Sequence, residues 1–212
     1  MYDDLKRQIV DVFRYIEEKG WNHGRAGNIS IYIRKENRVL ITPSGVPKSK
    51  LKPEEILVLD AEGNVIEGVG KPTIELPMHL AIYKAYDYVN AIIHAHGIYS
   101  TTLAIAREPL PALIDEMIIY VGGDIRVAEY APPGTSELAE NIVKALEGRK
   151  AAIIANHGLI ACGRDLEEAT EILGLVERIS QAYIFAKLLG KVNLLPKEIV
   201  ELHGKIFISR LK

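Results

Sequence analysis

Apolar positions near the start of the chain repeat with the period of a helix. They fall three or four residues apart, at Leu5, Ile9, Val12, Phe13 and Ile16. This spacing puts them on one face of a helix, and Gly20 supplies the glycine that often follows a helix end. A helix is therefore predicted over residues 3–19.

Further along, short apolar runs rich in β-branched residues lie between glycine, proline and asparagine. They predict strands at residues 28–33, 38–42, 56–60, 65–67, 90–95, 125–129, 151–155 and 159–161. Helical spacing and capping residues predict helices at residues 75–86, 98–107, 136–146 and 166–189. Early hairpin strands followed by alternating helices and strands favour an α/β sandwich with a mixed sheet, and leave the strand order open.

Length and composition favour a single domain over residues 1–212. The chain has 212 residues, of which 48% are apolar, so it can bury a large core. No linker rich in proline or serine, charge block or low-complexity run divides it. Residues 191–212, after the last predicted helix, are expected to form a C-terminal tail.

Charge and cysteine content argue against several partners and settings. The formal charge of −2 disfavours nucleic acid and anionic membranes as partners. Polar residues interrupt every apolar stretch before the roughly 18 residues that a membrane-spanning helix needs. Cys162 is the only cysteine, so no intrachain disulfide is expected, and Met1 opens directly into the first helix without a signal peptide. A reducing cytoplasm is the predicted setting.

The stretch NAIIHAHGIYS, residues 90–100, places two histidines at the end of a predicted strand. Residues two apart in a strand share a face, so His94 and His96 project side by side. Alone, such a pair is more often a packing feature than a metal site. The pattern returns in AAIIANHGLIACG, where His157 matches His96. Three imidazoles with an open fourth position suit a catalytic Zn²⁺, provided that both strands lie in one sheet.

A catalytic metal of this kind needs a group that moves protons. Glu75 begins a predicted helix after a Gly-Lys-Pro turn, and a carboxylate beside Zn²⁺ can act as a base. The plainer interpretation is a glutamate that interacts with the helix dipole. His79 lies four residues later on the same helical face. Because the His-Glu-x-x-His pattern is absent, His79 is predicted to pack or to support the site, not to bind the metal.

Two turns rich in small residues are candidates for binding an anion. GRAGN (24–28) and TPSG (42–45) lie at the ends of the first two predicted strands and come close in a hairpin. Backbone N–H groups in such turns form a nest for a phosphate without much positive charge. Polar side chains are available at Asn28, Thr42, Ser44 and Thr73. Ordinary turn chemistry explains each of them separately.

Five stretches occur together along the chain: GRAGNISIYI, ITPSGVPKSKL, GKPTIELPMHLAIY, AIIHAHGIYSTTLA and NHGLIACG. In this order and spacing they resemble the class II aldolase/adducin family, over roughly residues 5–190. The resemblance implies a three-layer α/β/α sandwich with a mixed, largely antiparallel central sheet. It also implies a homotetramer with active sites at subunit interfaces.

The resemblance also implies a role for each motif. The resemblance implies that His94, His96 and His157 bind zinc, one ion per subunit, and that Glu75 is the acid and base. The implied phosphate-binding residues are Asn28, Thr42, Ser44, Gly45 and Thr73. The implied partner is a small-molecule sugar phosphate, a ketose 1-phosphate such as L-fuculose 1-phosphate. Its reversible cleavage gives dihydroxyacetone phosphate and an aldehyde such as L-lactaldehyde.

Three departures from the aldolases of this family leave the aldehyde undetermined. Where those enzymes carry two adjacent serines before the glutamate, this chain has Thr73 and Ile74. The loop PALIDEMIIYVGG lacks the matching tyrosine acid, and the tail lacks the tyrosine that closes a neighbouring site. Substitutes for the acid are Asp115, Glu116 and Tyr120, and substitutes in the tail are His203 and Phe207.

Other activities of the same family remain alternatives. Pentulose-phosphate 4-epimerases resemble the chain in the histidines but carry aspartate at the position of Glu75. Glu75 therefore favours the aldolase, while Asp115 keeps the epimerase open. A methylthioribulose-1-phosphate dehydratase has the same metal set. An adducin-like binding module without catalysis is disfavoured, because it would be expected to lack the three histidines.

Overall fold

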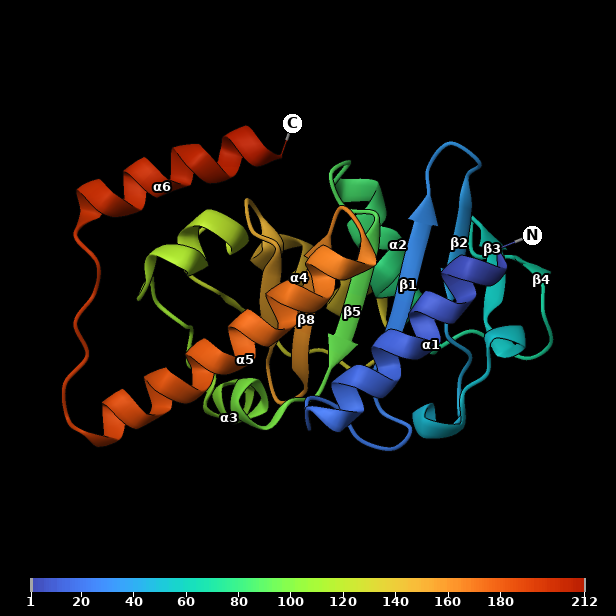
Figure 1. Ribbon diagram of the computed structural model, residues 1–212, viewed down its shortest axis with the longest axis horizontal. Helices are drawn as coiled ribbons and strands as arrows, with labels where there is room; N and C mark the ends of the chain where they lie inside the picture. Colours follow the sequence, from blue (N-terminus) through green and yellow to red (C-terminus); the bar gives the residue numbers. More distant parts are fainter. Residues whose placement is uncertain (1, 212) are drawn as a thin grey trace.

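A computed structural model describes residues 2–211 as helices packed on a central eight-stranded sheet (Figure 1). The strands are β1 (Asn28–Ile33), β2 (Arg38–Ile41), β3 (Leu57–Asp60), β4 (Val65–Glu67), β5 (Ala91–Ala95), β6 (Val127–Ala128), β7 (Ala151–Ile154) and β8 (Gly158–Gly163). The α-helices are α1 (Asp3–Glu18), α2 (Leu76–Ala85), α3 (Ile98–Ala106), α4 (Ser136–Leu146), α5 (Leu166–Leu188) and α6 (Lys197–Arg210). Two 3₁₀ turns, η1 (Lys48–Lys50) and η2 (Pro53–Glu55), and a π-helical segment, η3 (Met117–Val121), complete the described elements.

The sheet is mixed and largely antiparallel, as predicted. Its strand order is β4-β3-β2-β1-β5-β8-β7-β6, and in the described residues only β6 and β7 pair in parallel. The N-terminal half of the sheet is built from consecutive hairpin strands, β1 to β4. The other half inserts β8 between β5 and β7, so two strands far apart in sequence become neighbours at the centre.

Helices cover both faces of the sheet, which confirms the three-layer sandwich. Alternate residues of a strand point to opposite faces. In β5, Ile93 packs with α1 and α5, whereas Ile92 packs with α2 and α4. Figure 1 shows α1 and α5 crossing the near face, with α2 and α4 behind the sheet. No helix of the described residues is both long and apolar enough to cross a membrane.

Strand register brings the first candidate residues together. In the antiparallel pairing of β1 and β5, Asn28 lies opposite His94. In the pairing of β5 and β8, His94 lies opposite Ile160, so β8 begins beside the carboxyl end of β5. His157 immediately precedes β8 and therefore reaches the same end of the sheet.

The predicted helices and strands agree closely with the structure, except for one segment in the middle of the chain and one helix near the C-terminus. Sequence patterns do not predict the π-helical segment η3 or the helix α6, which occupies most of the expected tail. Helix α6 buries only Phe207 fully among its residues, so it lacks the apolar stripe that marks an amphipathic helix. Its contacts with the body are made mainly with η3. Tertiary docking, not periodicity, accounts for this helix.

Candidate metal centre and active site

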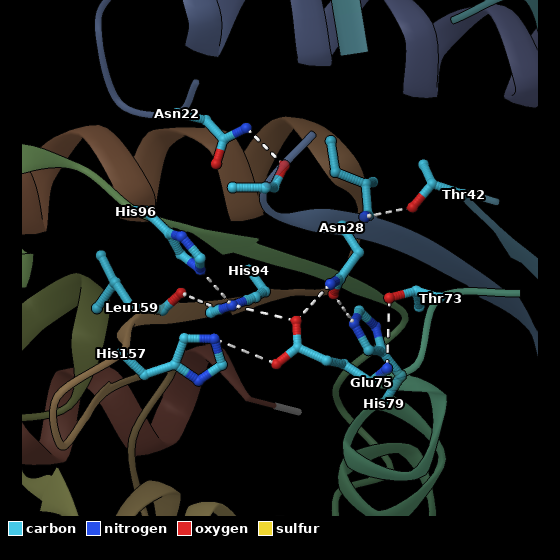
Figure 2. A network of polar contacts seen from close by, with 12 residues as sticks. Asn22, Asn28, Thr42, Thr73, Glu75, His79, His94, His96, His157 and Leu159 are labelled. Carbon is cyan, nitrogen blue, oxygen red and sulfur yellow. Dashed lines mark hydrogen bonds and ion pairs between the residues drawn. The ribbon is translucent and has the colours of Figure 1, made fainter. Parts of the chain in front are cut away.

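The three predicted histidines converge on one point at the carboxyl end of β5 (Figure 2). One ring nitrogen from each of His94, His96 and His157 lies within 4.8 Å of the other two. The Nε2 atoms of His94 and His96 are 2.8 Å apart, and the three ring centroids are separated by 4.7 to 5.0 Å. Ligands of one tetrahedral Zn²⁺ would be about 3.3 Å apart, so the cluster has the dimensions of a metal site.

The ring of His94 is held in the form that binds a metal. Nδ1–H of His94 donates a hydrogen bond of 3.0 Å to the carbonyl oxygen of Leu159. This bond leaves the lone pair on Nε2, which faces the other two rings. Burial, together with the neighbouring histidines, lowers the pKa of both His94 and His96 to about 3. Both rings are therefore neutral near pH 7, as ligands must be.

The turn before β8 makes room for the cluster. Asn156 adopts a left-handed conformation with φ of 55°, which turns the chain sharply before His157. A Cβ on Gly158 would lie 2.6 Å from the carbonyl oxygen of Ala95 and 2.7 Å from the ring of His96. Glycine is therefore required at position 158 for the β7–β8 turn to approach the β5 histidines. The Asn-His-Gly motif thus has a steric reason beside its chemical one.

Glu75 directs both carboxylate oxygens at the histidines. It occupies the N-cap position of α2, with Oε2 lying 3.3 Å from Nε2 of His94 and Oε1 lying 3.4 Å from Nε2 of His157. Oε2 also accepts a hydrogen bond of 2.7 Å from Asn28. Oε1 is buried and has no hydrogen-bond partner among the described residues. Carboxylate oxygens facing neutral imidazole lone pairs repel one another unless a cation lies between them, so this donor set fits a divalent metal.

His79 does not join the cluster. Its Nε2 lies 2.5 Å from Oδ1 of Asn28, and its Nδ1 lies 2.6 Å from Oγ of Ser30. The ring is completely buried between α2 and β1, and burial lowers its pKa to about 3. His79 therefore lies outside the histidine cluster, and the supporting role of this residue stays a prediction.

The two small-residue turns lie side by side, as the hairpin requires. The backbone N–H of Lys48, which follows the second turn, donates to the carbonyl oxygen of Gly24 in the first. A short bridge between Pro43 and Pro72 then aligns the second turn with the segment before Glu75. The turns consequently border the same end of β1 that carries Asn28.

Two threonines in these segments hold hydroxyl groups ready to donate. Oγ1 of Thr42 accepts a hydrogen bond from the backbone N–H of Ile29, and Oγ1 of Thr73 accepts one from the N–H of Glu75. Each hydroxyl keeps its own hydrogen for a further acceptor such as a phosphate oxygen. Ser44 and Gly45 are exposed at the tip of the second turn.

Asn28 has little capacity left for a phosphate. Its amide oxygen is engaged by His79 and one amide N–H by Glu75. A single N–H therefore remains for a ligand. The phosphate role of this residue stays a prediction, while its contact with the carboxylate is a feature that the sequence motif did not indicate.

The candidates for a second acid lie elsewhere in the chain. Asp115 contacts His203 at 3.2 Å, Glu116 pairs with Arg178, and Tyr120 lies against the guanidinium of Arg210. These contacts tie the segment to α5 and α6. The structure joins none of the three candidates to the histidine cluster within the part of the chain that it describes.

Two features near these elements escaped the sequence patterns. Lys48 lies in the polar stretch KSK, yet its side chain is buried and its ammonium group lies over the ring of Phe13. A hollow of about 1170 Å³ lies between α1 and α5 and is lined partly by Glu116 and Tyr120. None of the three clustered histidines lines it, so the histidine cluster and this hollow are separate features.

Comparison with known proteins connects this geometry to a family. Residues 7–184 match the model of the class II aldolase and adducin N-terminal domain. A 5-deoxy-D-ribulose 1-phosphate aldolase from Bacillus thuringiensis serovar kurstaki is 36% identical, over 95% of this chain and 94% of its own. An L-fuculose phosphate aldolase from Escherichia coli is 40% identical, over 85% of this chain and 82% of its own. A solved structure of an L-fuculose 1-phosphate aldolase superposes with a TM-score of 0.92 at 42% identity, covering 97% of this chain and 96% of that one.

The chain belongs to the class II aldolase and adducin family. Aldolases of this class depend on a metal ion, and the three-histidine cluster is where such an ion fits. Within the family the protein is an aldolase, a carbon–carbon lyase, and not a non-catalytic binding module.

Proposed function

We propose that the protein is a zinc-dependent aldolase that reversibly cleaves a ketose 1-phosphate to dihydroxyacetone phosphate and an aldehyde. The observation that carries the proposal is the convergence of three imidazoles and the Glu75 carboxylate on one point. Three nitrogen ligands with an open position are typical of catalytic zinc. A metal held there acts as a Lewis acid for the negative charge that develops on the substrate carbonyl oxygen.

Glu75 is the proposed acid and base of the reaction. Its Oε2 is held by Asn28, whereas Oε1 is buried without a hydrogen-bond partner among the described residues. Oε1 is therefore the free oxygen that takes a proton from the carbon next to the carbonyl during synthesis. In the cleavage direction the same oxygen returns the proton to that carbon.

The phosphate group is proposed to lie against the two small-residue turns. The free O–H hydrogens of Thr42 and Thr73 and the backbone around Ser44 and Gly45 are the available donors, with the remaining N–H of Asn28. Thr73 directly precedes the Ile74–Glu75 pair, so phosphate binding and proton transfer involve the same short segment. Such a segment fixes the distance between the phosphate and the reacting carbon.

The aldehyde is the less determined part of the substrate. One relative is named for L-fuculose phosphate and another for 5-deoxy-D-ribulose 1-phosphate. Cleavage of a 5-deoxypentulose 1-phosphate next to its first three carbons releases acetaldehyde, whereas L-fuculose 1-phosphate releases L-lactaldehyde. Both aldehydes end in a methyl group, so a methyl-terminated aldehyde is the class that we propose.

A second acid for the aldehyde oxygen is proposed to come from a neighbouring subunit. Asp115, Glu116 and Tyr120 lie with η3 and α6, and none contacts the cluster of its own chain. A homotetramer with active sites at subunit interfaces would bring one of them to a partner's site. We propose this assembly for a single-domain subunit that works in the reducing cytoplasm.

The direct test is condensation of dihydroxyacetone phosphate with a panel of aldehydes. Zinc-loaded protein is incubated with L-lactaldehyde, acetaldehyde, D-glyceraldehyde or glycolaldehyde, and new ketose 1-phosphate is followed by mass spectrometry. Glu75→Gln and His94→Ala are expected to abolish the product, while His23→Ala, which changes an exposed histidine outside the cluster, keeps it.

The same test decides against the proposal if it is wrong. A protein that contains zinc but condenses none of the aldehydes would exclude the aldolase substrates proposed here. Epimerisation of ribulose 5-phosphate and dehydration of methylthioribulose 1-phosphate would then be measured with the same three variants.

A further inference from the structure

A row of polar side chains runs inward from Glu75 between β1 and α2, and Figure 2 shows its first three members, Glu75, Asn28 and His79. Asn28 donates to Glu75 at 2.7 Å, and its amide oxygen lies 2.5 Å from Nε2 of His79. Nδ1 of His79 is 2.6 Å from Oγ of Ser30, which is 2.6 Å from the hydroxyl of Tyr83. The row thus contains five groups in continuous contact.

Two sequence periods create this row. Asn28 and Ser30 are two residues apart in β1 and share one face of the strand. Glu75, His79 and Tyr83 are four residues apart along α2 and share one face of the helix. Because these two faces meet, strand and helix residues alternate along the row.

The carboxylate at one end fixes the direction of every hydrogen bond. An ionised Glu75 can only accept, so Asn28 must present its NH₂ group to Glu75 and its oxygen to His79. Nε2 of His79 must then carry the proton, and Nδ1 must accept from the hydroxyl of Ser30. The hydroxyl of Tyr83 accordingly donates to Ser30, and every group has one defined role.

The row is sealed from solvent. Ser30 and His79 are completely buried, and Tyr83 is 3% exposed. Inside the protein no water competes for these hydrogen bonds, and a broken one leaves a buried polar group unpaired. Buried networks that are fully paired hold side chains in one geometry.

We propose that His79, Ser30 and Tyr83 are positioning residues, which act through Asn28 to hold Oε2 of Glu75 and so aim Oε1 at the reacting carbon. The inference rests on the proposed role of Glu75 as the acid and base. A carboxylate fixed through one oxygen keeps the other in a defined place. Misplacement of a catalytic group by about 1 Å typically costs on the order of 100-fold in rate.

The test separates proton transfer from the rest of the reaction. The enzyme exchanges the C–H hydrogen of dihydroxyacetone phosphate for deuterium in D₂O, and proton NMR follows the loss of signal without any aldehyde. His79→Met removes both hydrogen bonds of the ring, whereas His79→Gln, of similar length, offers one donor and one acceptor in their place.

We expect His79→Met to lower kcat for exchange by about 10- to 100-fold, the range seen when a supporting hydrogen bond is lost beside a metal site. The zinc content should stay as in the wild-type protein, and KM for dihydroxyacetone phosphate should change much less than kcat, because Thr42, Thr73 and the two turns remain in place. His79→Gln should recover most of the loss. A change in KM alone, or an unchanged kcat in His79→Met, would reject the positioning role.

Two further measurements keep the proposal testable if His79→Met folds poorly or loses zinc. Ser30→Ala removes only a hydroxyl, and we expect about a tenfold lower kcat for exchange with zinc content unchanged; an unaltered kcat would count against the proposal. Nitrogen NMR of His79 should show the proton on Nε2, and a proton on Nδ1 would contradict the direction of the row. Absence of exchange in zinc-loaded wild-type protein would instead reject the proposed function itself.

Discussion

At the scale of single residues, Lys48 is a charge that the fold buries without an acid partner. Its ammonium group is 3.4 Å from the carbonyl oxygen of Pro43 and makes no ion pair within the described residues. Burial lowers the pKa of Lys48 from 10.5 to about 8. Burying the charged form therefore costs stability near neutral pH.

Lys48→Met is expected to stabilise the protein near pH 7 by up to about 3 kcal/mol, because it removes the buried charge. Between pH 8 and 10.5 the unfolded chain holds this proton and the folded chain does not. Lys48 therefore contributes a rise of stability with pH through that window, so the slope of the unfolding free energy against pH should be more positive in the wild-type protein than in the variant. Urea unfolding of both proteins across the window checks this, and parallel pH profiles would contradict it.

His79 affects the stability of the protein at acidic pH. Burial lowers the pKa of His79 from 6.5 to about 3. Between pH 3 and 6.5 the imidazole is therefore protonated in the unfolded chain and neutral in the folded chain. Stability is therefore lost as pH falls through this window. In chelator-treated protein, His79→Met should reduce the slope of unfolding free energy against pH by about 1.4 kcal/mol per pH unit. Equal slopes in urea titrations of the two proteins would show that His79 is not responsible.

Some residues of the site could be predicted from the sequence, and others could not. His94 and His96 are two apart in a strand and His157 repeats their context, so their convergence follows from strand period and shared motif. The contact of Asn28 with Glu75 depends on where α2 lies against β1, which no local pattern specifies. The burial of Lys48 likewise comes from α1 and the turns around it, which no local pattern specifies.

At the scale of elements, α6 depends on one aromatic anchor. Phe207 is 3% exposed, and a Cβ on Gly122 after η3 would lie 2.8 Å from its ring. Phe207→Ala removes an interaction typically worth about 3–5 kcal/mol, which exceeds what a helix with one buried residue can otherwise gain. We therefore expect α6 and η3 to lose protection from hydrogen exchange while β5 and β8 keep theirs.

The matched control is Phe185→Ala, because Phe185 is 51% exposed on α5. This variant should leave exchange in α6 unchanged. If Phe207→Ala instead raised exchange across the central strands, α6 would be part of the main cooperative unit. If neither variant altered exchange, Phe207 would not be the anchor.

The elements that were predicted well share a physical cause. Helix α1 packs one apolar face against the core, and strands β1, β5 and β7 are short runs of largely buried residues, so sequence pattern and burial agree. Asp165 and Thr135 cap α5 and α4 through their side chains, as their residue types suggest. Helix α6 and segment η3 lie against each other and draw their order from that contact, which leaves no periodic signal in either.

At the scale of the whole molecule, the proposed assembly makes a quantitative prediction. Light scattering should give four times the 23.5 kDa mass of one chain. One of Asp115→Asn, Glu116→Gln or Tyr120→Phe should lower kcat for aldehyde condensation by at least about 100-fold, as loss of a catalytic acid does. The other two should have little effect, and a monomer would remove the basis for a shared site.

Subunit mixing tests whether two chains build one site. The acid variant so found is co-expressed with Glu75→Gln, so that each subunit lacks one of the two groups. In a mixed assembly about a quarter of the sites unite an intact Glu75 with an intact acid from the neighbour, and activity should return to that extent. If both groups act within one chain, every site stays defective and no activity returns.

The sheet itself has a consequence for how the enzyme acquires its metal. His94 and His96 lie at the end of β5, and His157 precedes β8, which is hydrogen-bonded to β5 along its length. The positions of the ligands are thus set by backbone hydrogen bonds between β5 and β8, which do not involve the imidazoles. Binding free energy is consequently not spent on folding, in contrast to small zinc domains that are unfolded without metal. Such a centre can be filled after the chain has folded, and the ion that it carries depends on which divalent metal its surroundings supply.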